Sequence, residues 1–257
     1  MPVALAAVEQ GAGPPLAILH GLFGSGRNWA SIAQRLAAHY RVIALDLRNH
    51  GASPWAETMD YGEMAEDVRA SLSARGYERY ALLGHSMGGK VAMVAALQHP
   101  ERVEQLIIAD IAPVSYPMRH LREVEAMRRL DLTGIQRRSQ ADVALASAIP
   151  DAAERAFLLQ NLIFDNGGAR WRLNLEAIEQ EMPRLVDFPA ISGGRTYDGP
   201  TLFIAGGRSD YVQPAYEPAI RRFFPKAEVA RIDKAGHWLH AEQPAEFLAI
   251  IERFLSR

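Results

Sequence analysis

Ser86 is the residue whose surroundings indicate chemistry most directly. It lies in the sequence GHSMG at 84–88, between an apolar run at 80–83 and a helical pattern at 87–98. This G-x-S-x-G spacing fits a nucleophile elbow, because the serine of an elbow occupies a strained strand-to-helix turn in which flanking side chains would collide with backbone. The pattern also arises by chance in about one chain in ten of this length. It therefore predicts a nucleophilic Ser86 only together with the other parts of such a site.

A histidine suited to act as the base follows late in the chain. His237 stands in AGHW at 235–238, directly after an apolar run that ends near Ile232. A glycine-histidine pair at that point lets the imidazole lie over the carboxyl end of a parallel sheet, where the sites of α/β proteins form. His240 follows three residues later, but no third ligand is spaced to join the two histidines at a metal ion. We therefore expect His237 to be the base and expect no metal site.

Two aspartates are candidates for the acid that orients this histidine. Asp110 ends the apolar run at 106–109, and Asp210 comes shortly after the run at 201–205. Either aspartate gives the order Ser, Asp, His that such a site uses on an α/β sheet. The other one would then be a hinge or turn residue with local hydrogen bonds. From the residues alone, Asp110 and Asp210 both stay open.

Backbone amides for a developing oxyanion are expected at two places. The sequence HGLFG at 20–24 follows the apolar run at 16–19, so the Leu22 N–H would face a carbonyl oxygen held at Ser86. The Met87 N–H is the second predicted donor, because it lies at the positive end of the helix that it begins. These parts predict acyl transfer to Ser86 followed by hydrolysis, a reaction that needs no metal or organic cofactor.

A sheet must hold these parts, and the sequence predicts one. Six short apolar runs have the length of strands that are buried on both faces of a parallel sheet; they lie at 16–19, 42–45, 80–83, 106–109, 201–205 and 229–232. Segments with a 3.6-residue period lie at 28–38, 61–75, 87–98, 214–224 and 244–255. This alternation predicts an α/β fold with a mostly parallel, doubly wound sheet.

The interval from about 111 to 199 lacks a comparable strand run. Helical stretches lie in it at 121–130, 141–149 and 152–164. An insertion of this length between two core strands is too long for a loop. We therefore expect a core domain formed by 1–112 and 196–257 and a helical cap at 113–195, which would roof the carboxyl end of the sheet.

The composition excludes several classes of protein. The 257 residues are 49% apolar and 23% charged, as in an ordinary globular chain. A net charge of -2 lacks the basic footprint of a nucleic-acid binder. The absence of cysteine excludes disulfides and thiolate catalysis. We find no signal peptide and no apolar run near the ~18 residues of a membrane span, and we expect a cytoplasmic protein that acts on a small molecule. The sequence indicates no oligomeric state.

The motifs together resemble the α/β-hydrolase fold over essentially the full chain. Four segments are similar to those of the YbfF-type esterases, a branch of small acyl-ester and thioester hydrolases: HGLFGS at 20–25, DLRNHG at 46–51, DIAP at 110–113 and GHW at 236–238. The resemblance implies that the acid is Asp110, in DIAP, and that Ser209 lies near the histidine. This sequence departs from the pattern of the branch by placing Asp210 directly after Ser209.

The predicted site and the resemblance lead to one hypothesis for the function. We expect a serine hydrolase that cleaves carboxylic esters or acyl thioesters of short to medium chain length through an acyl-enzyme on Ser86. The alternatives are a carbon-carbon bond hydrolase or perhydrolase on the same residues, or a non-catalytic ligand-binding receptor. The expected substrate-binding residues are Phe23, Ser209, Tyr211, Trp171 and Trp238. The cap residues that could attract an anionic leaving group such as CoA are Arg119, Arg122, Arg128 and Arg129.

Overall fold

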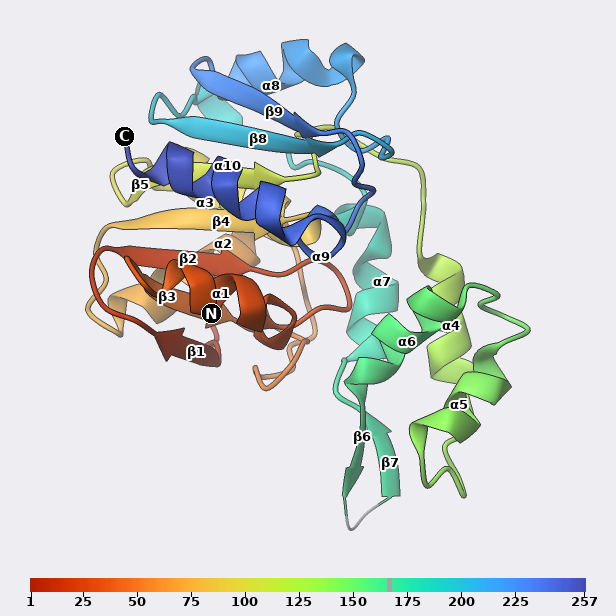
Figure 1. The fold of residues 1–257 in the computed structure, drawn as a ribbon. Helices are drawn as coiled ribbons and strands as arrows, with labels where there is room; N and C mark the ends of the chain where they lie inside the picture. The colour runs from red at the N-terminus through yellow and green to blue at the C-terminus, as the bar shows by residue number, and fades with distance from the viewer. Residues whose placement is uncertain (166–167) are drawn as a thin grey trace.

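A seven-stranded sheet forms the centre of the computed structural model, which describes residues 1–165 and 168–257 (Figure 1). Its strands are β1 (Ala7–Gln10), β2 (Pro15–Leu19), β3 (Arg41–Leu45), β4 (Tyr80–His85), β5 (Val103–Ala109), β8 (Thr201–Gly206) and β9 (Ala227–Ile232). Their order in the sheet is β1-β3-β2-β4-β5-β8-β9. The edge strand β1 runs antiparallel to β3, and the other neighbouring pairs are parallel.

The strands form where the sequence has continuous apolar runs, because a parallel sheet covered by helices buries both faces of each strand. All six residues of β4 are buried, and so are all six of β8. Each of the six predicted runs lies inside one of these strands, so the predicted mostly parallel α/β sheet is confirmed. The half-exposed edge strand β1 carries no such run.

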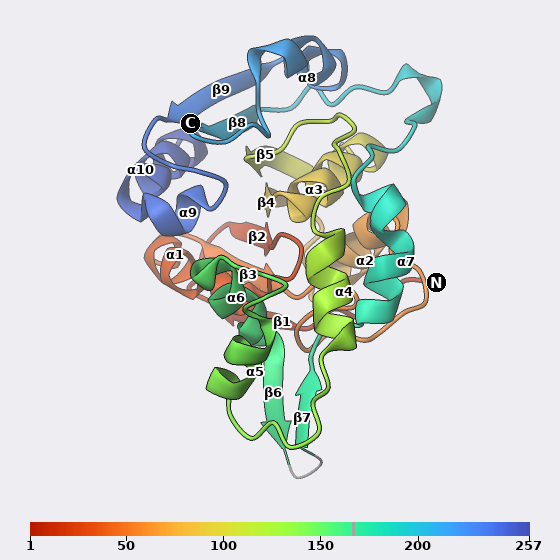
Figure 2. The same cartoon turned by 90° about the vertical axis from the view of Figure 1, so that its right-hand side faces the viewer.

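Helices cover both faces of this sheet (Figure 2). One face is covered by α2 (Tyr61–Ser73), α3 (Met87–Gln98) and α8 (Glu217–Phe223). The other face is covered by η1 (Gly26–Trp29), α1 (Ala30–Leu36), α9 (Leu239–Glu242) and α10 (Pro244–Leu255). Two further short turns are η3 (Ser192–Gly194) and η4 (Pro214–Tyr216). Within the two described stretches of chain, every helix is too short or too polar to span a bilayer.

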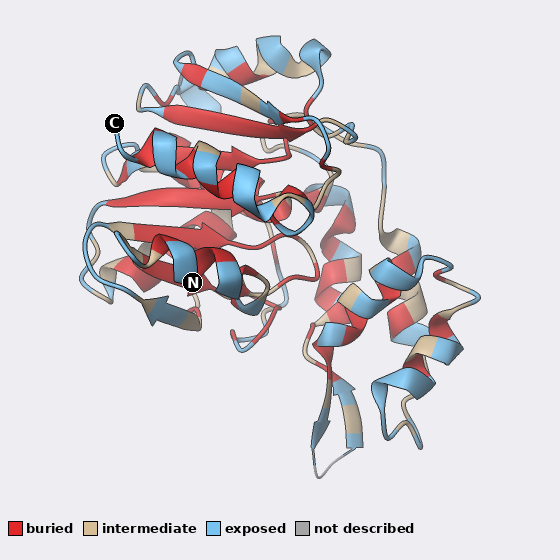
Figure 3. Ribbon diagram, viewed as in Figure 1, coloured by how far each residue is buried: buried red, intermediate tan, exposed pale blue. Residues whose placement is uncertain are grey.

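A second group of helices lies between β5 and β8 in the sequence, beside the carboxyl ends of the parallel strands (Figure 1). These helices are α4 (Leu121–Arg129), α5 (Arg138–Leu145), α6 (Ala152–Leu158), η2 (Leu159–Asn161) and α7 (Leu175–Leu185). Buried and exposed residues alternate along them, and the buried sides of α4 and α7 are in contact (Figure 3). We use the word cap for this insertion.

The cap also contains a β-hairpin, which the sequence did not reveal. The helix expected up to residue 164 ends as α6 at Leu158, and β6 (Leu162–Asp165) pairs antiparallel with β7 (Gly168–Trp171). Only Leu162 of the four β6 residues is buried. The prediction of a purely helical insertion is therefore wrong here. Residues 162–165 have too little apolar burial to leave a clear pattern in the sequence, and backbone pairing with β7 holds them in a strand.

Candidate active site

Ser86 occupies a strained turn between β4 and α3. Its backbone dihedrals are φ 52° and ψ -121°, in a region that residues with a Cβ rarely adopt. The glycines beside it are required by the close approach of other backbone atoms. A Cβ on Gly84 would lie 2.2 Å from the Gly88 carbonyl oxygen, and a Cβ on Gly88 would lie 2.4 Å from that of His20. The turn thereby presents Ser86 at the carboxyl end of β4.

Asp110 is the aspartate that contacts the histidine. Its carboxylate is fully buried at the end of β5, and Oδ2 lies 2.8 Å from His237 Nδ1. Two further donors hold the same carboxylate: the Gly206 N–H at 2.8 Å from Oδ1, and the Ser209 hydroxyl at Oδ2. With Nδ1–H donating to Asp110, His237 Nε2 is left as the proton acceptor.

Asp210 takes a different role. Both of its carboxylate oxygens accept hydrogen bonds from Arg119 of the cap, from Nη1 at 2.8 Å and from Nη2 at 2.5 Å. These bonds lower the pKa of Asp210. The side chain is half exposed and does not contact the imidazole. The structure therefore brings Asp110, and not Asp210, to the imidazole, and the role of Asp210 stays a matter for experiment.

Ser86 and His237 line one cavity of about 100 Å³ under the cap. No hydrogen bond joins the two side chains in the described part of the chain. A nucleophile and its base often come together only when substrate is bound. Both groups line the same cavity, so one bound molecule would be within reach of both.

Three of the five predicted substrate-binding residues line this cavity, namely Phe23, Tyr211 and Trp238. The Tyr211 ring stacks on the His237 ring with centroids 4.2 Å apart. Ser209 lies behind the histidine, where it binds Asp110, and does not line the cavity. Trp171 is buried inside the cap, where its indole N–H donates to the Met127 carbonyl at 3.0 Å. A pocket role for Trp171 is therefore not supported, since packing within the cap accounts for its burial.

The two predicted oxyanion donors border the same cavity. The amides of Leu22 and Met87 donate no hydrogen bond to another described residue. The amides that follow Leu22 are occupied: Phe23 N–H donates to His50 Nε2 at 3.3 Å, and Gly24 N–H donates to the Gly21 carbonyl at 2.9 Å. The loop thus leaves the Leu22 amide available.

Two histidines outside the predicted catalytic residues hold the loop at 20–24. His20 Nδ1 lies 2.8 Å from the Gly21 carbonyl oxygen, and His20 Nε2 accepts the Leu47 N–H at 2.9 Å. His50 Nδ1 lies 2.9 Å from the Arg48 carbonyl oxygen, so its Nε2 is left to accept from the loop. Burial lowers the pKa of both histidines, that of His50 to about 3, and keeps them neutral in these roles. The motif at 46–51 therefore supports the loop at 20–24, which carries the predicted Leu22 donor.

His85 positions the loop that carries His237, a role that the sequence did not indicate. Its Nε2 lies 2.8 Å from the backbone carbonyl oxygen of His237. Burial holds the pKa of His85 well below its ordinary value, so the ring is neutral and Nε2–H donates to that carbonyl. The residue inside the G-x-S-x-G pattern thus connects the nucleophile turn to the histidine loop.

Lys90 is a buried amine that lines the same cavity. Its Nζ donates to the carbonyls of Val186 at 2.9 Å and Asp187 at 2.6 Å, where α7 ends, and lies 4.9 Å from the Tyr116 ring centroid. Lys90 therefore ties α3 of the core to the end of α7 in the cap. Burial lowers its pKa to about 7.

We predict that Lys90 makes stability depend on pH. Between pH 7 and its ordinary pKa of 10.5, the unfolded chain keeps a proton on Lys90 that the folded protein has released. The free energy of unfolding should therefore rise with pH in this window, by up to about 1.4 kcal/mol per pH unit relative to Lys90→Met. Urea unfolding of both proteins at pH 7, 8 and 9 measures this difference, with exposed Lys226→Met as the control for loss of a charge. Parallel stability curves would contradict it.

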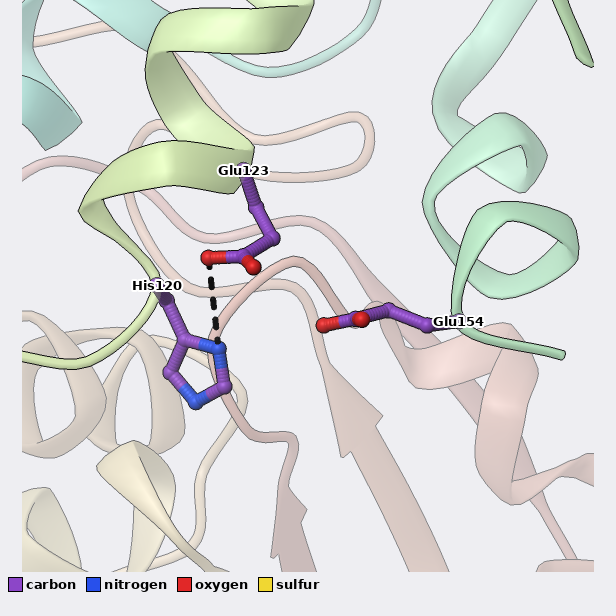
Figure 4. Close-up of side chains that lie close together, drawn as sticks. All are labelled: His120, Glu123 and Glu154. Carbon is purple, nitrogen blue, oxygen red and sulfur yellow. Dashed lines mark ion pairs between the residues drawn. The ribbon is translucent and has the colours of Figure 1, made fainter. Parts of the chain in front are cut away.

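One group of side chains in the described residues has the composition of a metal site. The ligand atoms of His120, Glu123 and Glu154 all lie within 4.8 Å of one another, and His120 Nδ1 is 3.9 Å from Glu123 Oε2 (Figure 4). His120 and Glu154 line the cavity that Ser86 and His237 also line. Burial raises the pKa of Glu154 and lowers that of His120, which favours their uncharged forms. The expectation of a metal-independent reaction stays a prediction.

The four cap arginines that were candidates for binding an anion each face a carboxylate. Arg119, Arg122, Arg128 and Arg129 pair with Asp210, Glu123, Glu179 and Glu125, respectively. Their charges are thus compensated by neighbouring residues. The hypothesis that these arginines attract an anionic leaving group is therefore not supported, because intramolecular ion pairs already occupy them.

Comparison with known proteins agrees with this geometry. The chain matches the alpha/beta hydrolase fold family over residues 14–244. It is 40% identical over 251 residues to the sn-1-specific diacylglycerol lipase ABHD11 of Mus musculus, covering 95% of this chain and 81% of that protein. It is 35% identical over 243 residues to the esterase YbfF of Escherichia coli, covering 94% of this chain and 93% of the relative.

A solved structure shows the same similarity in three dimensions. The marine microorganism esterase superposes with a TM-score of 0.94 at 37% sequence identity, covering 98% of this chain and 99% of the other. The resemblance to the YbfF-type esterases inferred from the sequence is therefore confirmed. With a family match over nearly the whole length and relatives of this identity, the chain belongs to the alpha/beta-hydrolase fold family.

Proposed function

We propose that this protein is a serine hydrolase that cleaves carboxylic esters or acyl thioesters through an acyl-enzyme on Ser86. The esterase and lipase relatives support ester hydrolysis as the general activity. The observation that carries the finer proposal is the 2.8 Å contact between Asp110 Oδ2 and His237 Nδ1, beside the cavity that the strained Ser86 also lines. A ligand-binding receptor would have no use for this arrangement.

In the proposed reaction, Ser86 Oγ attacks the substrate carbonyl while His237 Nε2 takes its proton. Asp110 keeps the required tautomer and stabilises the imidazolium that forms. The Leu22 and Met87 amides bind the oxyanion of the tetrahedral intermediate. His237 then gives the proton to the leaving alkoxide or thiolate. Attack by water, activated in the same way, releases the acid from Ser86.

The cavity has two walls that we assign to the two halves of the substrate. One wall, formed by α2, α3 and α7, includes Tyr61 and Leu185. The other, formed by η1, α6 and the segment before α9, includes Phe157 and Trp238, whose ring centroids are 5.8 Å apart. Figure 2 shows these elements on opposite sides of β4. Since His237 protonates the leaving group and precedes Trp238, we place the leaving group at the second wall and the acyl chain at the first. We call the first the acyl wall and the second the leaving-group wall.

A chain-length series tests this function. With p-nitrophenyl esters of two to sixteen carbons, kcat/KM should rise roughly fourfold per carbon, because each buried CH₂ contributes ~0.8 kcal/mol. It should then fall steeply once the chain outgrows the acyl wall, giving a maximum at short to medium chains. Rates in EDTA should be unchanged, because no step uses a metal. A flat series would contradict an enclosed acyl chain. No turnover of any ester or thioester would contradict the hydrolase and favour the carbon-carbon, perhydrolase or receptor alternatives.

A further inference from the structure

A second cavity, of about 380 Å³, adjoins the active-site cavity where the cap meets the oxyanion loop. Arg27 of η1, Arg138 at the start of α5 and Arg172 just after β7 line it. Phe23 and Asn28 line both cavities, which makes the two neighbours. We call it the arginine cavity. In Figure 2, α5 and α6 lie on the same side as α1, which is the side of the leaving-group wall.

The guanidinium groups of the arginine cavity have no carboxylate partner among the residues that the structure describes. Arg138 is held by backbone instead, donating to the carbonyls of Leu159 at 3.0 Å and Leu162 at 2.8 Å. The side chains of Arg27 and Arg172 make no hydrogen bond to another described residue. Burial and the charge of Arg27 lower the pKa of Arg172. Three like charges thus line one cavity without an ion-pair partner in the described chain, with Arg27 and Arg138 exposed and Arg172 half-buried.

One nearby carboxylate offsets part of this charge. Asp46 acts electrostatically on Arg172, although it forms no ion pair with the three arginines, and its two oxygens accept hydrogen bonds at 2.7 Å from the backbone amides of Gly26 and Ala52. The Asn28 side chain donates to Gln160 Oε1 at 2.8 Å and so connects core and cap beside the cavity. The arginine cavity therefore carries a net positive charge of the kind that binds an anion.

We propose that the arginine cavity binds a phosphate group carried by the leaving group of the substrate. Guanidinium groups bind phosphate through paired, charge-assisted N–H bonds, and phosphate brings the negative charge that three arginines require. The position beside the leaving-group wall assigns the phosphate to the alcohol or thiol half of the substrate. The proposal rests on the proposed hydrolase function and names the class of substrate for it.

Two matched substrate pairs test the proposal. Butanoyl-CoA and S-butanoyl-N-acetylcysteamine share the thioester, and 1-butanoylglycerol 3-phosphate and 1-butanoylglycerol share the ester. In Arg27→Gln/Arg172→Gln, kcat/KM for a phosphate-bearing member should fall at least tenfold more than for its neutral partner. The Arg27→Lys/Arg172→Lys variant should keep part of the preference, because it keeps the charge. Arg129→Gln, which removes an exposed charge elsewhere on the cap, is the control and should change neither ratio.

The outcomes distinguish failure of the phosphate site from failure of the proposed hydrolase function. Equal losses for both members of each pair would overturn the phosphate site while leaving the hydrolase intact. A shift confined to the CoA pair identifies a nucleotide-borne phosphate, and a shift confined to the glycerol pair identifies a lipid phosphate. If no substrate is turned over, calorimetry of butanoyl-CoA and of 1-butanoylglycerol 3-phosphate on the Ser86→Ala protein decides instead. A tenfold weaker Kd for either ligand in the added Arg27→Gln/Arg172→Gln background supports the site, and unchanged Kd values for both overturn it.

Discussion

Ser86→Ala is expected to lower kcat by about 10⁴-fold or more, because the variant loses the atom that forms the acyl-enzyme. Substrate binding should survive, since the cavity walls and the Leu22 and Met87 amides are unchanged. The residual rate would come from these binding and oxyanion contributions. Stopped assays with the best p-nitrophenyl ester measure kcat, and calorimetry measures binding.

Labelling by a fluorophosphonate probe gives an independent measurement of the same residue. The wild type should be labelled at one serine, and Ser86→Ala should not be labelled. Ser139→Ala, at an exposed position on α5, is the matched control and should keep both labelling and turnover. If Ser86→Ala kept more than about a tenth of the wild-type kcat, Ser86 would not be the nucleophile.

The sequence predicted the strained turn at Ser86 well because the constraint on this turn is local. The positions of Gly84 and Gly88 follow from backbone atoms a few residues away or from the neighbouring β2 end, and a pattern of five residues records that constraint. The strands were predictable for a similar reason, since burial on both faces demands a continuous apolar run. The half-exposed strand β1 and the hairpin of the cap have no continuous apolar run, so the sequence did not predict them.

The choice between the two aspartates could not be made from residue types and spacing. Asp110 and Asp210 each follow a strand, and β5 and β8 are neighbours in the sheet, so both ends lie near the histidine loop. What separates them is a contact with the cap, where Arg119 binds Asp210 across 91 positions of the chain. Only the family resemblance pointed to Asp110 beforehand.

The same limit applies to the charged residues of the cap. The sequence shows many arginines, but not which of them face a carboxylate. Arg128 pairs with Glu179 because α4 packs against α7, whereas Arg27 and Arg172 meet in a cavity between core and cap without one. Charge compensation is a property of helix packing. It therefore appears only when the distant segments are placed together.

The second large effect is expected at Asp110. In Asp110→Asn, the amide no longer accepts the Nδ1–H bond as a carboxylate does, so the imidazole is free to adopt the tautomer that cannot take the Ser86 proton. We expect kcat to fall by about 10³- to 10⁴-fold. Circular dichroism and thermal unfolding must accompany the assay, because the same carboxylate also binds the Gly206 amide and the Ser209 hydroxyl.

Asp210→Asn is the matched control, since it makes the same chemical change one residue beyond Ser209. It removes a charge that faces Arg119 and leaves the contact between Asp110 and His237 intact. A loss of less than about tenfold is expected, because an exposed ion pair contributes only about 1 kcal/mol or less. Its effect should fall mainly on KM, since Arg119 and Tyr211 line the cavity. Comparable losses of kcat in the two variants would mean that Asp210 shares the orienting role, and a larger loss in Asp210→Asn would reverse the assignment of the acid.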